Sequence, residues 1–199
     1  LVQAENLGTE KNKFFAVQIN KSSKELYTLL ENLLQWSRKQ SGNLKFQPEM
    51  FNINNVIDDV FSLYDIIARE KNILLSKVNC DKEVFADKNM IETVFRNILS
   101  NALKFTPENG NINIHTKEEN NYLYISISDN GTGIPPEKMD FIFDYSYTYS
   151  SSDMKEKGSG IGLALCRDFV KINGGSIYVQ SEVNVGTTFT FSIPLKPKK

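Results

Sequence analysis

The apolar residues in the middle of the chain change from a helical repeat to a strict alternation. After Asp87, a residue type that favours the position just before a helix, they recur at helical spacing as far as Ala102. A turn sequence at 107–110 ends this repeat, and residues 111–117 and 122–129 then alternate apolar with polar side chains. A strand pair with one apolar face needs a layer to cover it, so the pattern predicts helices packed on a sheet.

The same two patterns continue on both sides of this stretch. Helical spacing predicts further helices over residues 52–72, 136–143 and 160–173, and alternation predicts strands over 73–78, 176–182 and 187–195. Together these elements predict an α+β fold, a two-layer α/β sandwich with helices on one face of a mixed, mostly antiparallel sheet.

A helical segment precedes this sandwich in the sequence. A serine–glutamate capping box at 22–25 is followed by leucines at helical spacing over residues 26–34. Such a narrow apolar seam predicts packing against another helix or a second copy of the chain. With an extended linker at Pro48, we expect a short all-helical domain over residues 1–45 and the sandwich domain over residues 46–199.

The composition excludes several classes of site. The formal net charge of −1 argues against a surface that neutralises the phosphates of a nucleic acid. Cys80 and Cys166 are far apart, so they provide neither a zinc site nor a disulfide framework and are expected to be reduced core thiols. No apolar run is long enough to span a membrane, so we expect a cytoplasmic protein. Because the chain begins at Leu1 rather than at methionine, we expect it to be part of a larger protein.

Polar residues interrupt the regular pattern at four places. Asn97 and Asn101 lie one helical turn apart, where neutral amide oxygens suit magnesium, although solvated surface asparagines are the simpler explanation. Residues 129–133, Asp-Asn-Gly-Thr-Gly, follow a predicted strand. A carboxylate there suits an exocyclic amine and the glycines let a flat ring approach the backbone, while a plain turn explains the same residues.

The other two places are rich in glycine. Residues 158–162, Gly-Ser-Gly-Ile-Gly, run into the last predicted helix and leave several N–H groups at its start for an anion. Their spacing lacks the later glycine and the parallel strand unit of a Rossmann site, and also the lysine of a Walker loop. Residues 186–189, Gly-Thr-Thr-Phe, are explained on their own by a tight hairpin turn.

Taken in order, the four places resemble the ATP-binding domain of histidine protein kinases, which is similar to those of gyrase, the mismatch-repair ATPases and the ninety-kilodalton heat-shock chaperones. RNILSNALKFT resembles the N box of these kinases, DNGTGI the first glycine box, FIF the phenylalanine box, GSGIGLAL the second glycine box and VGTTFTFSIPL the last. The upstream sequences KNKFFAV and LLQWSRKQSG resemble the dimerisation and phosphotransfer helices. The resemblance covers nearly the whole chain and implies a kinase that binds ATP with magnesium.

The resemblance also implies roles for individual residues. Asn101, with Asn97 close by, would bind magnesium, and Lys104 would reach a phosphate. Asp129 would hold the adenine amino group, and Gly133 would line the ring.

Other residues would complete the nucleotide site by the same resemblance. Either Thr187 or Thr188 would add a water-mediated contact, and residues 144–157 would form a mobile lid whose Lys157 would touch a phosphate or remain solvated. The full set of candidate nucleotide-binding residues is Asn97, Asn101, Lys104, Phe105, Asp129, Gly131, Gly133, Ile134, Phe143, Lys157, Gly158, Gly160, Ile161, Gly162, Leu163, Thr187 and Thr188.

The sequence lacks the residue that receives phosphate in this family. There the acceptor histidine lies on the first phosphotransfer helix and is followed by an acidic residue, whereas here KNKFFAV runs directly into Gln18. The one histidine, His115, lies on a predicted strand and is expected to be a surface residue rather than the acceptor. We expect an acceptor segment to be missing between Val17 and Gln18, so no catalytic residue is assigned and this chain is not expected to autophosphorylate. A Cα–Cα distance of about 3.8 Å across that bond would indicate a true deletion.

Three functions fit these observations. The first is the core of a two-component sensor histidine kinase, which passes phosphate from ATP to a histidine and then to a response-regulator aspartate. The second is an anti-sigma-type serine kinase with the same ATP fold, and the third is a non-catalytic, nucleotide-regulated interaction module.

The first function implies particular partners and a particular chemistry. The partners are ATP, a response-regulator receiver domain and a second copy bound through the N-terminal helices in the intact protein, with membrane attachment only through segments upstream. Related ATPases usually have a glutamate at the position of Asn97, and an amide cannot take a proton from water. We therefore expect binding of magnesium-ATP with negligible hydrolysis.

Overall fold

The computed structural model describes residues 44–145 and 161–197, together with positions 12, 15, 16, 19, 23, 26, 30, 33, 34, 37, 41 and 42 of the preceding segment. The chain divides into two units, Leu1–Leu44 and Lys45–Lys199. The full predicted capping box at 22–25, the junction of Val17 with Gln18 and the predicted lid from residue 146 onward lie outside the described residues.

In the first unit, every described position from 12 to 37 is helical, as the leucine spacing predicts. The described leucines of the seam are all exposed; they are Leu26, Leu30, Leu33 and Leu34. Within the described residues, no helix is both long and apolar enough to cross a membrane.

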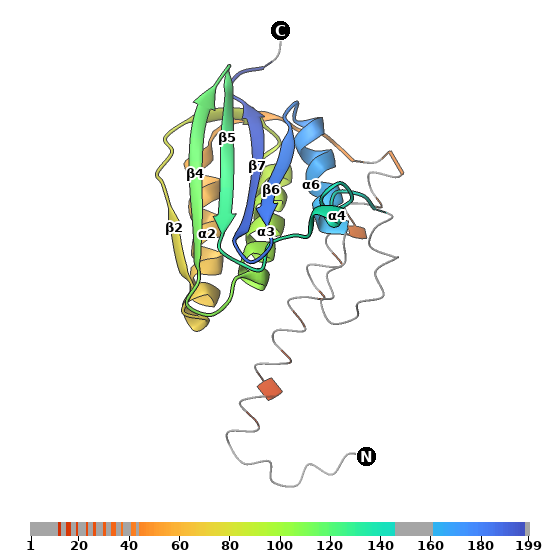
Figure 1. Ribbon diagram of the computed structural model, residues 1–199. Coiled ribbons are helices and arrows are strands. Elements are labelled where there is room, and N and C mark those ends of the chain that lie inside the picture. The colour runs from red at the N-terminus through yellow and green to blue at the C-terminus, as the bar shows by residue number, and fades with distance from the viewer. Residues whose placement is uncertain are drawn as a thin grey trace. The chain divides into compact units, whose positions relative to one another are not determined.

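Three helices form one layer of the second unit: α2 (Ile53–Glu70), α3 (Lys88–Phe105) and α6 (Ile161–Ile172). The first two begin at the caps that the sequence predicts. Asn52 Oδ1 accepts a hydrogen bond from Asn54 N at 2.9 Å, and Asp87 Oδ1 accepts one from Met90 N at 3.2 Å. Helix α3 contacts both α2 and α6, and Figure 1 shows α2 and α3 behind the sheet and α6 to the right of β6.

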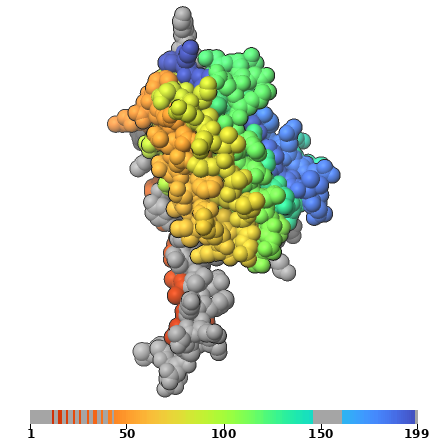
Figure 2. Space-filling model, turned by 90° about the vertical axis from the view of Figure 1, so that its left-hand side faces the viewer, coloured from red at the N-terminus to blue at the C-terminus, as the bar shows by residue number. Residues whose placement is uncertain are grey.

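The other layer is a five-stranded sheet in the order β2-β4-β5-β7-β6. Its members are β2 (Leu74–Lys77), β4 (Asn111–Glu119), β5 (Tyr122–Asp129), β6 (Ile177–Glu182) and β7 (Gly186–Pro194). Strands β2 and β4 are parallel and the other neighbours are antiparallel. In the edge-on view of Figure 2, α2 in orange lies to the left of β4 and β5 in green, so the two predicted layers are confirmed.

The core lies between these layers and is built from the two periodicities of the sequence. Residues of α3 at helical spacing and Leu123, Ile125 and Ile127, at alternate positions of β5, are almost fully buried. Phe95 of α3 meets Phe191 of β7 edge to face, with ring centroids 5.4 Å apart. The two cysteines are buried and unpaired, as predicted, and burial raises the pKa of the Cys166 thiol.

Two features of the second unit differ from the sequence-based expectations. Residues Glu49–Asn52, within the expected linker region, form strand β1, which pairs antiparallel with β3 (Glu83–Ala86) in a separate ribbon. The helix expected over residues 136–143 is shorter, because α4 spans only Pro136–Met139 and turns follow it.

Candidate functional site

The two asparagines singled out by the sequence lie near the C-terminal half of α3. Asn97 is only 9% exposed, and its Nδ2 donates to Thr93 O at 3.0 Å, so this amide is held against the helix rather than solvated. Asn101 is half-buried one turn later. Lys104 is exposed, and its Nζ lies 4.8 Å from the centre of the Phe105 ring.

The loop after β5 contacts this same end of α3. Thr132 N donates to Phe105 O at 3.3 Å, and a Cβ on Gly131 would lie 2.6 Å from that carbonyl oxygen. Only a residue without a side chain allows such a close approach. The contact brings the asparagine helix and the Asp129 loop to one place, although they are separate in the sequence.

The same loop also contacts the turn between β6 and β7. Gly133 has φ +70°, and a Cβ there would lie 2.1 Å from Glu182 O. Asn184 N donates to Thr132 O at 2.9 Å across this contact. Two glycines therefore fix the loop between a helix end and a hairpin turn.

Asp129 ends β5 opposite Thr187, near the start of β7. Its Oδ1 accepts a hydrogen bond from Gly131 N at 2.9 Å. Burial raises the pKa of the Asp129 carboxyl, while hydrogen bonds from the backbone of Gly131 and Thr187 oppose that rise. A half-buried carboxylate in this position is a strong acceptor for an amine that can reach it.

The register of β7 separates the two threonines that the sequence leaves as alternatives. Thr187 is 7% exposed and pairs with Asp129, whereas Thr188 pairs with Ser128 and the two hydroxyl oxygens lie 2.9 Å apart. Because neighbouring residues of a strand point to opposite faces, only Thr187 shares the face of Asp129. The arrangement favours Thr187 as the site residue.

Ser181 of β6 belongs to this cluster and was not expected from the sequence. Its Oγ accepts a hydrogen bond from Ile134 N at 2.8 Å and lies 2.9 Å from Thr187 Oγ1. The sequence did contain an indication of this role. Ser181 follows Ile177 and Val179 at alternate positions of β6, so it lies on the same, less exposed face of the strand. The hydroxyl ties the loop after Gly133 to the start of β7.

The start of α6 and the phenylalanine after α4 complete the described part of the site. The first turn of α6 consists of Ile161, Gly162 and Leu163. Helix α6 packs against α3, where Cys166 Sγ lies 3.8 Å from Val94 O. The ring of Phe143 meets that of Phe189 edge to face, with centroids 6.2 Å apart. Lys157, Gly158 and Gly160 lie outside the described residues.

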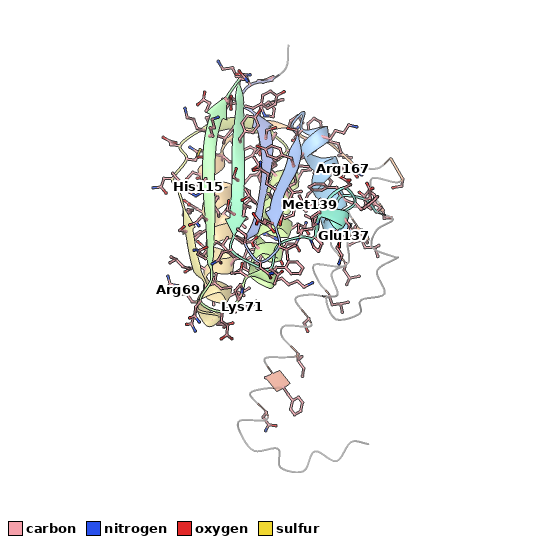
Figure 3. The ribbon with its side chains drawn as sticks, viewed as in Figure 1. Arg69, Lys71, His115, Glu137, Met139 and Arg167 are labelled. Atoms are coloured by element: carbon pink, nitrogen blue, oxygen red, sulfur yellow. The ribbon has the colours of Figure 1, made fainter. Side chains whose placement is uncertain are left out.

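His115 is exposed on β4, between β2 and β5, and Figure 3 labels it along the length of that strand. The sequence-based expectation of a surface histidine is confirmed. The described residues contain no group of three His, Cys, Asp or Glu side chains that could hold a metal ion. A cation at this site would therefore depend on the amides of α3 together with oxygen atoms of a ligand and water.

Comparisons with known proteins match the part of the chain that contains the candidate site. Residues 86–197 match the family described as Histidine kinase-, DNA gyrase B-, and HSP90-like ATPase. The chain is 32% identical over 197 residues to the adaptive-response sensory kinase SasA of Prochlorococcus marinus (strain AS9601), covering 98% of this chain and 53% of that protein. It is 31% identical over 192 residues to the sensor histidine kinase WalK of Bacillus subtilis (strain 168), covering 94% of this chain and 31% of that protein.

Solved structures agree with these matches. The catalytic domain of histidine kinase ThkA superposes with a TM-score of 0.64 at 32% identity, over 76% of this chain and 99% of that one. ThkA in complex with the response regulator protein TrrA gives a TM-score of 0.73 at 27% identity, over 98% of this chain and 54% of that one. The chain spans about half the length of the SasA relative and about a third of WalK.

Proposed function

Because this chain belongs to the family of histidine kinase-, DNA gyrase B- and HSP90-like ATPases, we propose that it is the ATP-binding catalytic core of a two-component sensor histidine kinase. One observation carries most of this proposal: Thr132 N bonds to Phe105 O at 3.3 Å. That contact joins the Asp129 carboxylate to the helix end that bears Asn97 and Asn101. The similarity to sensor kinases over nearly the whole chain favours a histidine kinase over other ATPases.

The adenine end of the site lies at the loop after β5. Asp129 accepts a hydrogen bond from the exocyclic amine, and the absence of side chains at Gly131 and Gly133 lets the ring approach the backbone. Thr187 supplies a water-mediated contact, held in position by Ser181. Ile134 and Phe143 line the ring with apolar surface.

The phosphate end lies between α3 and the first turn of α6. The first N–H groups of a helix have no acceptor within the helix and favour an anion. Ile161, Gly162 and Leu163 supply these groups, and Lys104 adds a positive charge from α3. Lys157, Gly158 and Gly160 belong to the same proposed phosphate site.

The chemistry of the α3 amides fits a magnesium ion shared with phosphate. Asn101 would hold the ion, with Asn97 beside it, and the remaining ligands would be phosphate and water oxygens. Magnesium, when bound, neutralises charge on the phosphate oxygens. Asn97 has no carboxylate to take a proton from water, so we expect negligible ATP hydrolysis.

The transfer itself needs a histidine from outside this chain. An imidazole nitrogen forms a bond to the γ-phosphorus as the bond from that phosphorus to the leaving oxygen of ADP breaks, and the imidazole proton passes to a neighbouring base. His115, exposed on β4, is not that acceptor. The phosphoryl group then passes to the aspartate of a response-regulator receiver domain, a partner class that the ThkA–TrrA complex supports.

The two units have separate proposed roles. Residues 1–45 are the partial dimerisation and phosphotransfer helices, with the acceptor segment missing after Val17, and residues 46–199 are the catalytic ATP-binding domain. The intact protein is a homodimer through these helices and acts in the cytoplasm, attached to a membrane only through upstream segments. Neither the serine kinase nor the non-catalytic module is favoured by the relatives.

Labelled ATP and a separately supplied acceptor helical hairpin test this proposal. We expect label on the hairpin histidine, no label on this chain alone and negligible release of free phosphate. Label on a serine would favour the anti-sigma-type kinase, and no label anywhere despite nucleotide binding would favour the non-catalytic module. Rapid steady ATP turnover that Asp129→Asn abolishes would contradict the role given to Asn97.

A further inference from the structure

Two side-chain contacts join the segment after α4 to the middle of α6. Asp144 Oδ1 accepts a hydrogen bond from Arg167 Nη1 at 2.9 Å, and Tyr145 OH donates to Asp168 Oδ2 at 2.5 Å. Figure 3 labels Arg167 in the same part of the view as Glu137 and Met139 of α4. We call these two interactions the α6 contact pair; the proposed nucleotide chemistry uses neither of them.

The segment that carries Asp144 and Tyr145 is itself fixed to the sheet. Phe143 packs edge to face on Phe189 of β7, and Asp144 N donates to Phe141 O at 2.8 Å in a turn. Three consecutive residues, 143–145, therefore contact both β7 and α6. The segment connects the sheet layer to one side of α6.

The other side of α6 is held by α3. Cys166 Sγ lies 3.8 Å from Val94 O, and Asn173 Nδ2 lies 3.6 Å from Met90 Sδ near the far end of the helix. These contacts lie at the middle and the end of α6. The first turn, Ile161–Leu163, is only half-buried, so its own packing does not fix its orientation. The orientation of the helix axis therefore depends on the contacts that α6 makes on its two sides.

The contact pair is poorly suited to act mainly through stability. The Arg167 and Asp144 side chains are 43% and 40% exposed, and ion pairs at such positions contribute little to the free energy of unfolding. Burial, and then the hydrogen bond to Asp168, raises the pKa of Tyr145 above its ordinary value, at which the hydroxyl is already protonated at neutral pH. A fixed donor and a charged pair add directional specificity to whatever stability they contribute.

We propose that Asp144, Tyr145, Arg167 and Asp168 are positioning residues that direct the first turn of α6 toward the phosphates of a bound nucleoside triphosphate. This inference rests on the proposed ATP-binding function and adds to it a determinant of phosphate binding. The inference assigns the binding of two parts of the ligand to different elements of the protein. The phosphates depend on the direction of α6, whereas the adenosine part depends on Asp129 and the loop after β5.

Binding of a non-hydrolysable ATP analogue and of adenosine, measured side by side, tests the inference. We expect Tyr145→Phe, Asp168→Ala and Asp144→Ala each to weaken binding of the ATP analogue by about five-fold or more and to leave adenosine binding unchanged. Asp168→Asn keeps an oxygen acceptor for the tyrosine and is expected to bind the ATP analogue like the natural protein. The double variant Tyr145→Phe with Asp168→Ala is expected to bind the ATP analogue as tightly as either single variant, because both substitutions remove the same hydrogen bond.

A matched ion pair away from the site provides the control. Lys82 and Glu118 are 49% and 48% exposed and 2.7 Å apart, so Glu118→Gln removes a comparable interaction and is expected to leave both affinities unchanged. Equal weakening of the ATP analogue and adenosine by the contact-pair variants, or no weakening of either, would overturn the inference while the function stands. Failure of the natural protein to bind either ligand would instead overturn the proposed function.

Discussion

Gly133 lies where the loop after β5 touches the β6–β7 turn. Two features penalise a side chain there: the φ of +70°, and the distance of only 2.1 Å that would separate a Cβ from Glu182 O. We expect Gly133→Ala to lower the free energy of unfolding by about 2 kcal/mol or more, because the turn must move. Urea unfolding measures this change, and adenine binding is expected to weaken with it.

Gly42 separates the two causes in that prediction. It has φ +69°, and no atom of the described residues lies within 4 Å of a Cβ there, so Gly42→Ala introduces the backbone strain without the collision. We expect this control to cost about 1 kcal/mol or less. An equal cost for both substitutions would show that the contact with Glu182 is unimportant.

Asp129 links nucleotide binding to pH at the residue scale. Burial raises the pKa of its carboxyl from the ordinary 3.8, so above the raised pKa the charged carboxyl destabilises the folded state. We expect Asp129→Asn to be at least as stable as the natural protein at neutral pH. Any stability advantage of the variant should disappear as the pH falls through the raised pKa toward 3.8, where the natural carboxyl is protonated in both states.

Nucleotide affinity should follow the same titration in the opposite direction. A charged acceptor binds the adenine amine more strongly than a neutral one, so affinity is expected to fall as Asp129 takes up a proton, at a higher pH than for an ordinary aspartate. Chemical unfolding and nucleotide titration across the acidic range measure the two effects. A variant much less stable than the natural protein at neutral pH would contradict this account of the carboxyl.

At the scale of elements, the capping residues of α3 and α2 differ in the hydrogen bonds that they make. Asp87 is 5% exposed; it caps α3 and its Oδ2 also accepts a hydrogen bond from Gln47 N at 3.0 Å. Its own N donates to Asn173 Oδ1 at 2.7 Å, beyond the end of α6. We expect Asp87→Ala to lower the free energy of unfolding by about 2–4 kcal/mol, since the N–H groups of buried Met90 and of Gln47 lose their acceptor, whereas the backbone bond to Asn173 remains.

Asn52 is the matched cap on α2. It is half-buried and accepts a hydrogen bond from Asn54 N at 2.9 Å, so Asn52→Ala is expected to cost only about 1 kcal/mol. Urea unfolding of both variants gives the comparison. A cost for Asp87→Ala no larger than that for Asn52→Ala would mean that the additional side-chain bond to Gln47 N adds nothing.

The elements themselves were predictable where local patterns are strong. Asp87 and Asn52 mark the starts of α3 and α2, and the alternation of β5 and the first half of β4 appears in the structure as predicted, whereas β7 is buried at nearly every position. The ribbon of β1 and β3 was missed, because its four-residue strands are too short to show a period and pair across about 30 intervening residues. The spacing of apolar residues indicates which face of a strand is buried. It does not indicate with which distant strand it pairs.

At the scale of the whole molecule, the sequence located the candidate site but not its internal arrangement. The glycines of the loop after β5 indicate a close approach, and the structure adds what they approach, Phe105 O and Glu182 O. The choice between Thr187 and Thr188, and the part taken by Ser181, depend on strand register, which the motifs do not contain. Residues that meet only through the sheet could not be identified from spacing alone.

The exposed leucine seam of the first unit predicts self-association of the intact protein. Leu30 is 49% exposed and lies among leucines at helical spacing. We expect Leu30→Glu to shift a dimer toward monomer in analytical ultracentrifugation, because a buried charge at a helix interface has a high desolvation cost. Ser41→Glu, at an exposed turn position after the leucines, is the control, and an equal shift by both variants would contradict an interface through the seam.

Calorimetric titration of this chain with a magnesium-bound, non-hydrolysable ATP analogue tests the central claim most directly. The account predicts one site per chain, with affinity reduced roughly 10- to 100-fold by Asp129→Asn, which removes a charged acceptor. Glu137→Gln, which removes an exposed charge on α4, is expected to bind like the natural protein. No binding by the natural protein, or undiminished binding by Asp129→Asn, would contradict the account.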